Sequence, residues 1–259
     1  MRVLSLGAGV QSSTLLLMAC EQQERIDAAI FADTGWEPAA VYRHLAWLEE
    51  QARRASIPVY RVSAGDLRDD ALRGDSRSWM PMYVQQPHGG RGRLKRQCTT
   101  NYKIGPIRRQ LRALGALRAH PADVLIGISL DEVRRMRDSD VRYVRHVYPL
   151  VERRMTRGDC LTWLRQRGYP EPQKSACVGC PFRSADDWRR LTAEEFAQAV
   201  AFDAAMRWRR SKRGAAAYLH SSLVPLDQVD LRSQQDRGQL ELDFDGCGVL
   251  CVAEEEVAP

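Results

Sequence analysis

The sequence predicts an α/β fold: a doubly wound, mostly parallel five-stranded sheet, followed by a helical C-terminal region that contains cysteines. Short apolar runs alternate with longer helical segments through the first part of the chain, as in strands joined by crossover helices. A turn of small residues also follows the first apolar run, which is typical of a ligand-binding sheet edge. We therefore expect a nucleotide-binding domain over 1–151 and a helical region over 152–259.

Each expected strand is a short aliphatic run bounded by turn residues. The segment 66–97 between two such runs is polar and rich in Gly and Arg, and its length predicts a substrate-facing lid or a partly disordered loop. The tail after Val229 is polar and ends in two further cysteines. The expected strands are 2–7, 27–35, 57–64, 122–129 and a fifth at 145–151, and the expected helices are 12–23, 37–55, 104–117, 157–168 and those around 185–213.

Arginine is concentrated in patches such as 89–98 and 107–118, and the 39 Lys and Arg against 33 Asp and Glu give a net charge of +6. Such patches suit phosphate, tRNA or DNA as partners, although a solvated Arg-rich surface has the same composition. Because no apolar run reaches the roughly 18 residues of a membrane span, we expect a soluble cytoplasmic protein without a membrane partner. The sequence leaves open whether the protein forms a homodimer.

The segment 5–14, SLGAGVQSST, predicts a phosphate-binding loop between the first strand and helix. Small residues let backbone N–H groups approach phosphate oxygens, and hydroxyls and the helix dipole add donors. No Gly-Lys-Ser/Thr follows, so this is not a Walker loop. The candidate nucleotide-binding residues here are Ser5, Gly7, Ala8, Gly9, Gln11, Ser12 and Ser13.

This loop resembles the Ser-Gly-Gly-x-Asp-Ser pyrophosphate loop of the N-type ATP pyrophosphatases, with Ala8 and Gln11 departing from the pattern. The segment FADTGWEP resembles the Asp-Thr-Gly-x-x-x-Pro stretch of phosphoadenosine phosphosulfate (PAPS) reductases, which belong to the same PP-loop superfamily. The resemblance implies ATP or a related adenine nucleotide beside Asp33, Thr34 and Gly35, with Lys103 as a further nucleotide-binding candidate. Asp33 alternatively caps the following helix.

The segment 96–108 also resembles that family, whose members have a cysteine ahead of a Lys-x-x-Pro helix start, here Lys103 and Pro106. Its iron–sulfur members have a Cys-x-x-Cys further along the chain. The resemblance implies that Cys98, Cys177 and Cys180 hold three corners of a 4Fe–4S cluster, with structural zinc as the alternative. Cys20 and Cys160 fall in helical apolar patterns and are expected in the core.

Two further segments carry candidate catalytic residues. The tail motif DGCGVLC resembles the cysteine-containing ending of sulfonucleotide reductases, so Cys247 is a mobile nucleophile, a fourth cluster ligand or an inert tail residue. After the fourth strand, Asp131 and Glu132 suit magnesium binding or proton transfer and Arg135 suits phosphate. A charged helix start explains the same residues equally well.

The resemblance implies the first two of three candidate functions, and the cysteine pair and basic patches suggest the third. The first is an ATP-dependent, iron–sulfur-assisted sulfur transferase that adenylates a nucleic acid or nucleotide and uses a sulfur-donor protein. The second is a thiol-dependent reductase of PAPS or adenylyl sulfate that releases sulfite. The third is a non-enzymatic, zinc-stapled nucleic-acid-binding module.

Overall fold

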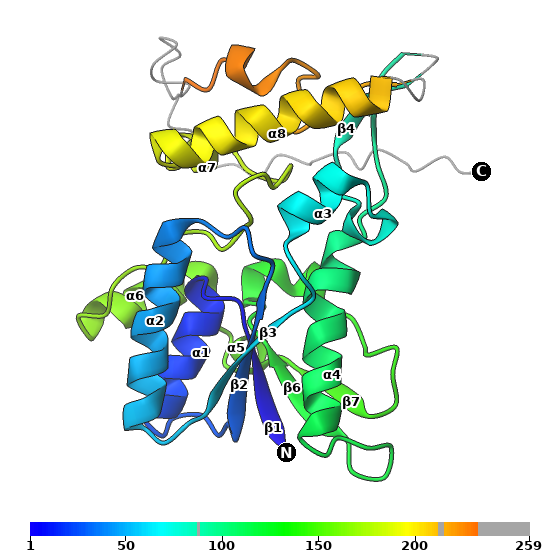
Figure 1. The fold of residues 1–259 in the computed structure, drawn as a ribbon. Coiled ribbons are helices and arrows are strands. Elements are labelled where there is room, and N and C mark those ends of the chain that lie inside the picture. The colour runs from blue at the N-terminus through cyan, green and yellow to red at the C-terminus, as the bar shows by residue number, and fades with distance from the viewer. Residues whose placement is uncertain (87–88, 212–214, 233–259) are drawn as a thin grey trace.

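The computed structural model describes residues 1–86, 89–211 and 215–232. Five parallel strands form the main sheet in the order β3-β2-β1-β6-β7 (Figure 1). The chain order reverses between β1 and β6, so the sheet is doubly wound and has its switch point there. The fold-class prediction is confirmed. The strands are β1 (Arg2–Leu6), β2 (Ala28–Asp33), β3 (Val59–Ser63), β6 (Ala122–Ile126) and β7 (Val144–Val147).

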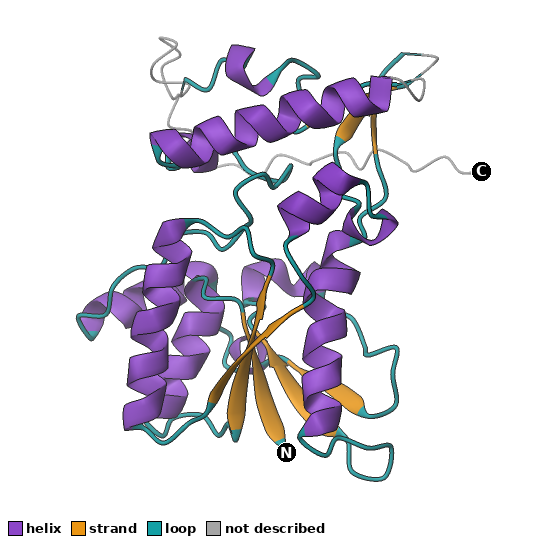
Figure 2. Cartoon of the chain, in the orientation of Figure 1, coloured by secondary structure: helices purple, strands orange, loops and turns teal. Residues whose placement is uncertain are grey.

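Helices cover both faces of this sheet (Figure 2). Alternate residues of the strands point to opposite faces, so Leu4 and Phe31 lie in one core while Val3 and Ile30 lie in the other. The first core packs against α1, α2 and α6, and the second packs against α4. The helices are α1 (Val10–Cys20), α2 (Ala39–Arg54), α4 (Gly105–Ala113), α5 (Pro149–Glu152) and α6 (Arg157–Gln166).

A second layer lies over the carboxyl ends of the strands (Figure 1). It has its own apolar core, to which Trp36, Tyr102, Cys177, Trp188 and Phe202 belong. Its antiparallel sheet has the order β5-β4-β8. The elements are α3 (Leu67–Arg73), η1 (Ser76–Ser78), β4 (Tyr83–Gln85), β5 (Arg91–Arg93), α7 (Ala185–Arg189), α8 (Ala193–Ser211), β8 (Ala217–Tyr218) and η4 (Leu226–Gln228).

The segment 66–97 differs from its expectation, because its described part contains α3, η1 and the β4–β5 hairpin. Helix α3 begins where the Asp66 side chain accepts the Asp69 amide at 2.8 Å, and it ends at Gly74 with φ +87°. The fifth strand is also shorter than expected, because Pro149 begins α5. No helix among the described residues is long and apolar enough to cross a membrane.

Core packing joins distant parts of the chain. Cys160 and Leu164 of α6 lie in the first core with α1, whereas Leu67, Met80 and Tyr102 share the second-layer core with residues after 177. The division into 1–151 and 152–259 stays a prediction.

Candidate functional site

The glycine loop, residues 7–9, connects β1 to α1 at the switch point of the sheet. Ala8 has φ +53°, a left-handed conformation that glycine adopts more easily. The Ser12 hydroxyl accepts the Gly7 amide at 3.1 Å and donates to the Gly9 carbonyl at 3.3 Å, which fixes the turn. Ser5 lies within β1, below the loop. The loop therefore presents its backbone at the N-terminus of an 11-residue helix, a favourable place for phosphate.

Ser13 does not lie on the surface formed by the glycine loop and the N-terminus of α1. Its side chain is fully buried, and its hydroxyl lies 2.9 Å from Nε2 of His44 on α2. The prediction that Ser13 contacts the nucleotide is corrected on that ground, because a hydroxyl in the core cannot reach a ligand at the sheet edge. Burial lowers the pKa of His44 to about 4, so the imidazole is neutral at pH 7.

Gln11 connects the glycine loop to the loop after β6. Its amide donates to Ser129 Oγ at 3.3 Å and to Glu132 Oε2 at 3.1 Å, and the other oxygen of Glu132 pairs with Arg135. These residues therefore gather at the switch point. Asp131 instead accepts the backbone amide of Arg157 at 3.0 Å, which stabilises the start of α6.

The loop after β2 is organised by its own carboxylates. Asp33 Oδ1 accepts the Gly35 amide at 2.8 Å and the Tyr42 hydroxyl at 2.7 Å, so Asp33 holds a turn and does not cap α2. Gly35 has φ +73°, which this turn requires. Thr34 is buried and its hydroxyl lies 3.2 Å from Cys177 Sγ. Thr34 therefore contacts the thiol site, where the sequence predicted a nucleotide contact.

Cys177 and Cys180 lie in a tight turn that packs on Trp36. The Cys180 amide donates to the Cys177 carbonyl at 3.0 Å, and the Val178 amide donates to the Trp36 carbonyl at 2.8 Å. Arg183 is buried beneath the turn and donates to the carbonyls of Ala176, Cys177 and Val178 at 2.7–3.2 Å. The cysteine turn is thus fixed both to the loop after β2 and to the segment that leads into α7.

Glu37 is the centre of the polar contacts around Cys177. It is 5% exposed, and its Oε1 lies 3.1 Å from Thr34 Oγ1, 3.2 Å from Lys103 Nζ and 3.5 Å from Cys177 Sγ. Its Oε2 has no hydrogen-bond partner among the described residues. Sequence reasoning missed Glu37, although it lies within the FADTGWEP segment.

Burial and charge determine the protonation of these groups. Burial raises the pKa of the Cys177 thiol, the Glu37 carboxylate raises it further, and the Lys103 ammonium opposes the shift. Burial also raises the pKa of Cys180. For Lys103, burial lowers the pKa, but the charge of the Glu37 carboxylate and its hydrogen bond raise it, and the pKa is raised overall. Both thiols are therefore protonated at neutral pH beside a charged ammonium group.

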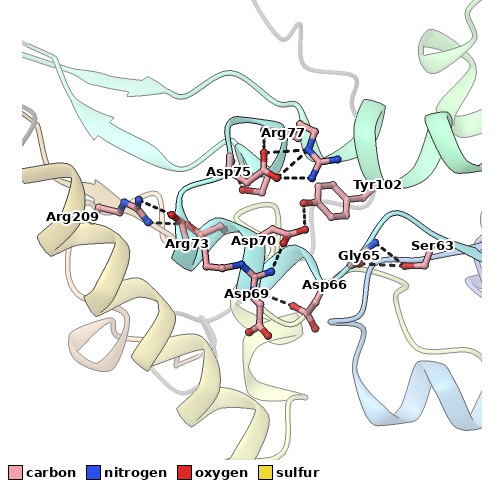
Figure 3. Close-up of polar contacts among 12 residues, drawn as sticks. Ser63, Gly65, Asp66, Asp69, Asp70, Arg73, Asp75, Arg77, Tyr102 and Arg209 are labelled. Carbon is pink, nitrogen blue, oxygen red and sulfur yellow. Dashed lines mark hydrogen bonds and ion pairs between the residues drawn. The ribbon is translucent and has the colours of Figure 1, made fainter.

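Lys103 lies in η2 (Thr99–Ile104), a π-helical segment that leads into α4. Figure 3 shows how the preceding residue anchors it: Tyr102, 1% exposed, donates its hydroxyl to Asp70 of α3 at 2.6 Å. Asp70 also pairs with Arg73, and Arg209 of α8 donates to the carbonyls at the end of α3. The second layer thus positions the Lys103 segment against β2.

Cys98 precedes η2, and its amide donates to the Trp79 carbonyl at 3.1 Å. Cys98 and Cys180 both pack against the core that contains Cys177, while Cys20 and Cys160 lie with the first core, as expected. Within the described ranges, however, no three His, Cys, Asp or Glu side chains are arranged to hold a metal ion. The donor set does not fit a cluster or zinc in this arrangement, and the metal assignments stay predictions. Cys247 and Cys251 lie outside the described residues.

Ser175 brings the cysteine segment onto the glycine loop. A Cβ atom at Gly9 would lie 3.4 Å from the Ser175 Cβ, and one at Gly7 would lie 4.0 Å from its hydroxyl. No hydrogen bond of this hydroxyl occurs among the described residues, so it can donate to a bound anion. Sequence reasoning missed Ser175, whose only signal was its place two residues before Cys177.

No protein-family model matches the sequence, and no curated protein matches it. Among solved structures, the chain is similar to the PAPS reductase of Candida auris in its phosphate complex, with a TM-score of 0.46 and 12% sequence identity. The similarity covers 68% of this chain and 80% of that chain. A similarity with this TM-score and identity carries no argument about the chain. The fold class is assigned from the strand order of the sheet.

Proposed function

We propose that the protein is an adenine-nucleotide-dependent sulfur transferase. ATP adenylates an acceptor oxygen with release of pyrophosphate. Sulfide then attacks the carbon that carries this oxygen, so that a C–S bond forms as the C–O bond breaks and AMP leaves. The observation that carries this proposal is the contact of Ser175 with the glycine loop, since it brings a phosphate-binding turn and a cysteine turn to one edge of the sheet. Nucleotide activation and sulfur delivery need that proximity.

The glycine loop supplies the phosphate half of the site. The backbone at Gly7–Gly9 and the N-terminus of α1 favour a negatively charged group, and Ser175 adds a free hydroxyl. Gln11 stands where the resemblance would place an acidic residue, and it contacts Glu132. We propose that Glu132 provides the carboxylate for Mg²⁺ in its stead.

The thiol half is formed by Cys98, Cys177 and Cys180, with Lys103 as the nearby positive charge. An ammonium group beside a thiol favours the thiolate when the proton leaves. A 4Fe–4S cluster, with zinc as the alternative, remains a prediction for these three thiols.

The test begins with anaerobic purification of the full chain and titration with ATP, followed by pyrophosphate measurement with sulfide and total tRNA present. We expect ATP binding and acceptor-dependent pyrophosphate release. Sulfite release from adenylyl sulfate or PAPS with a reduced thiol protein would support the reductase and contradict the transferase. Zinc without nucleotide binding would support the non-enzymatic module. Iron, zinc and sulfide analysis of the same preparation shows whether a cluster or zinc is bound.

A further inference from the structure

The stretch around β5 carries positive charges that no acidic side chain neutralises within residues 1–86, 89–211 and 215–232. None of its four cations has a carboxylate within ion-pair distance in the described part of the chain. Arg91 donates to the Ser221 carbonyl at 3.1 Å and Arg96 to the Thr99 hydroxyl at 2.8 Å, both neutral acceptors. The four cations, here called the β5 cations, are Arg91, Arg93, Lys95 and Arg96.

Nearby arginines differ from the β5 cations. Arg73 of α3 pairs with Asp70 at 2.5 Å, and Arg77 of η1 pairs with Asp75 at 2.6 Å. Arg61 of β3 pairs with Glu49. Because like charges close in sequence repel, a run of cations without counter-charges is unfavourable until an anion neutralises it. The repeated charge along the stretch matches a polyanion better than a single phosphate.

Aromatic rings lie among these charges. Arg93 and Arg96 lie over the ring of Phe182, with centroid distances of 5.6 and 5.3 Å, and Arg91 lies 5.5 Å from the centroid of Tyr83. Phe182 is 36% exposed, although an apolar ring of its size is usually buried. Arginine planes and exposed rings together form the surface on which unpaired bases stack.

We infer that the β5 cations and Phe182 bind an unpaired segment of nucleic acid, with the cations on its phosphates and Phe182 on a base. A duplex fits the charges but hides its base faces, so it leaves the exposed ring without a partner. A small anionic substrate would need one or two of the cations and no aromatic platform.

This surface adjoins the thiols. Phe182 follows Cys180 by two residues, and Arg96 precedes Cys98 by two. A base stacked on Phe182 therefore lies beside the cysteine site, where the proposed transferase would hold its acceptor. The inference rests on the proposed function for its chemical meaning, but the binding itself is measured separately from nucleotide use.

The experiment measures binding of labelled single-stranded RNA, single-stranded DNA and duplex DNA to the full chain by fluorescence anisotropy, at 50 and 200 mM salt. We expect one of the single strands to bind more tightly than the duplex, and the comparison of RNA with DNA identifies the acceptor's sugar. R93Q/R96Q is expected to weaken binding at least tenfold. Log K, where K is the association constant, falls with log salt, and the variant is expected to make this slope shallower by about 1.4. F182A is expected to weaken binding about 5- to 100-fold with the slope unchanged.

The matched control is R53Q/R54Q, which also removes two exposed arginine charges, here at the end of α2 where both pair with Glu50. It is expected to change affinity less than twofold. ATP affinity is measured in every variant. R93Q/R96Q should retain it, whereas Gly9→Val should lose ATP and still bind the single strand, so the two proposals fail separately.

Equal loss of affinity in R93Q/R96Q and R53Q/R54Q would overturn the inference, because general charge would then explain the binding. Duplex binding as tight as that of both single strands would overturn it too, as would the absence of binding by any probe at 50 mM salt.

Discussion

Gly179, between the two cysteines of the turn, lies directly on the indole ring of Trp36. A Cβ atom at Gly179 would come within 2.1 Å of Trp36 Cη2, far inside van der Waals contact. Trp36 is 4% exposed and also packs on Phe202 of α8 with ring centroids 4.7 Å apart, so the indole cannot move aside freely. The glycine between the cysteines is therefore required for packing.

The first prediction concerns this contact. Gly179→Ala is expected to lower the free energy of unfolding by about 1–3 kcal/mol, because the methyl group overpacks the second-layer core. Thermal and urea unfolding of the full chain measure it. Gly158→Ala in α6 is the control, since its Cβ would meet only the Thr156 hydroxyl at 3.6 Å, and it should be neutral or stabilising. A Gly179→Ala protein as stable as the Gly158→Ala protein would contradict the packing argument.

The second prediction concerns the glycine loop. Gly9 has φ −97° and ψ 178°, a backbone open to any residue, and its Cβ would make ordinary contact with Ser175. Gly9→Ala should therefore fold with its stability changed by less than about 1 kcal/mol, yet bind ATP at least tenfold more weakly, because the methyl group occupies the phosphate's space. Calorimetric titration measures the affinity.

Ala8→Gly is the companion variant, since glycine adopts the left-handed φ of +53° without strain. It should bind ATP like the original chain. Unchanged ATP affinity in a folded Gly9→Ala protein would show that the nucleotide lies elsewhere.

The third prediction concerns the anchor of the Lys103 segment. Tyr102→Phe removes the only donor hydroxyl of that ring and leaves the buried Asp70 carboxylate short of one partner. We expect a loss of about 1–3 kcal/mol in the free energy of unfolding. Arg77→Gln, which breaks an exposed pair with Asp75, should leave the melting temperature unchanged. If both variants melt alike, the Tyr102–Asp70 hydrogen bond does not stabilise the fold.

The parallel sheet was predictable because each of its strands can be recognised within one short stretch of sequence. Residues 2–6 and 28–33 are short, largely apolar runs, and the turns after them contain Gly. The second layer was not predictable in this way. Strands β5 and β8 have three and two residues, too few for any alternation, and β8 pairs with β4 through Tyr218 and Tyr83, which lie far apart in the sequence.

The site was predictable only in part, for a related reason. Gly7–Gly9 and the cysteines are residue types that indicate their chemistry by themselves. Glu37 and Ser175 are ordinary residues whose importance comes from what the fold places beside them: Lys103 and Cys177 for the first, the glycine loop for the second. The same long-range contacts explain why Ser13 was misplaced, since its burial depends on His44 of α2.

The last prediction concerns the pH dependence of stability, which His44 should dominate in the weakly acidic range. The imidazole is partly buried between Ser13 and Trp47, with ring centroids of His44 and Trp47 5.5 Å apart. Burial lowers its pKa from 6.5 to about 4. In the unfolded chain the imidazole is in water and titrates near its ordinary value.

Between pH 6.5 and 4 the unfolded chain therefore binds a proton that the folded chain does not, so the free energy of unfolding falls as the pH falls. The loss of unfolding free energy from this residue is at most about 3 kcal/mol, and it is complete below pH 4.

His44→Gln keeps a donor for the Ser13 hydroxyl and removes the titration. Urea unfolding of both proteins at several pH values isolates the effect, because carboxylates titrate equally in each. We expect the difference between the two stability curves to grow from pH 6.5 down to 4 in favour of His44→Gln. Parallel curves across that range would mean that the folded chain accommodates the imidazolium and that burial does not control this residue.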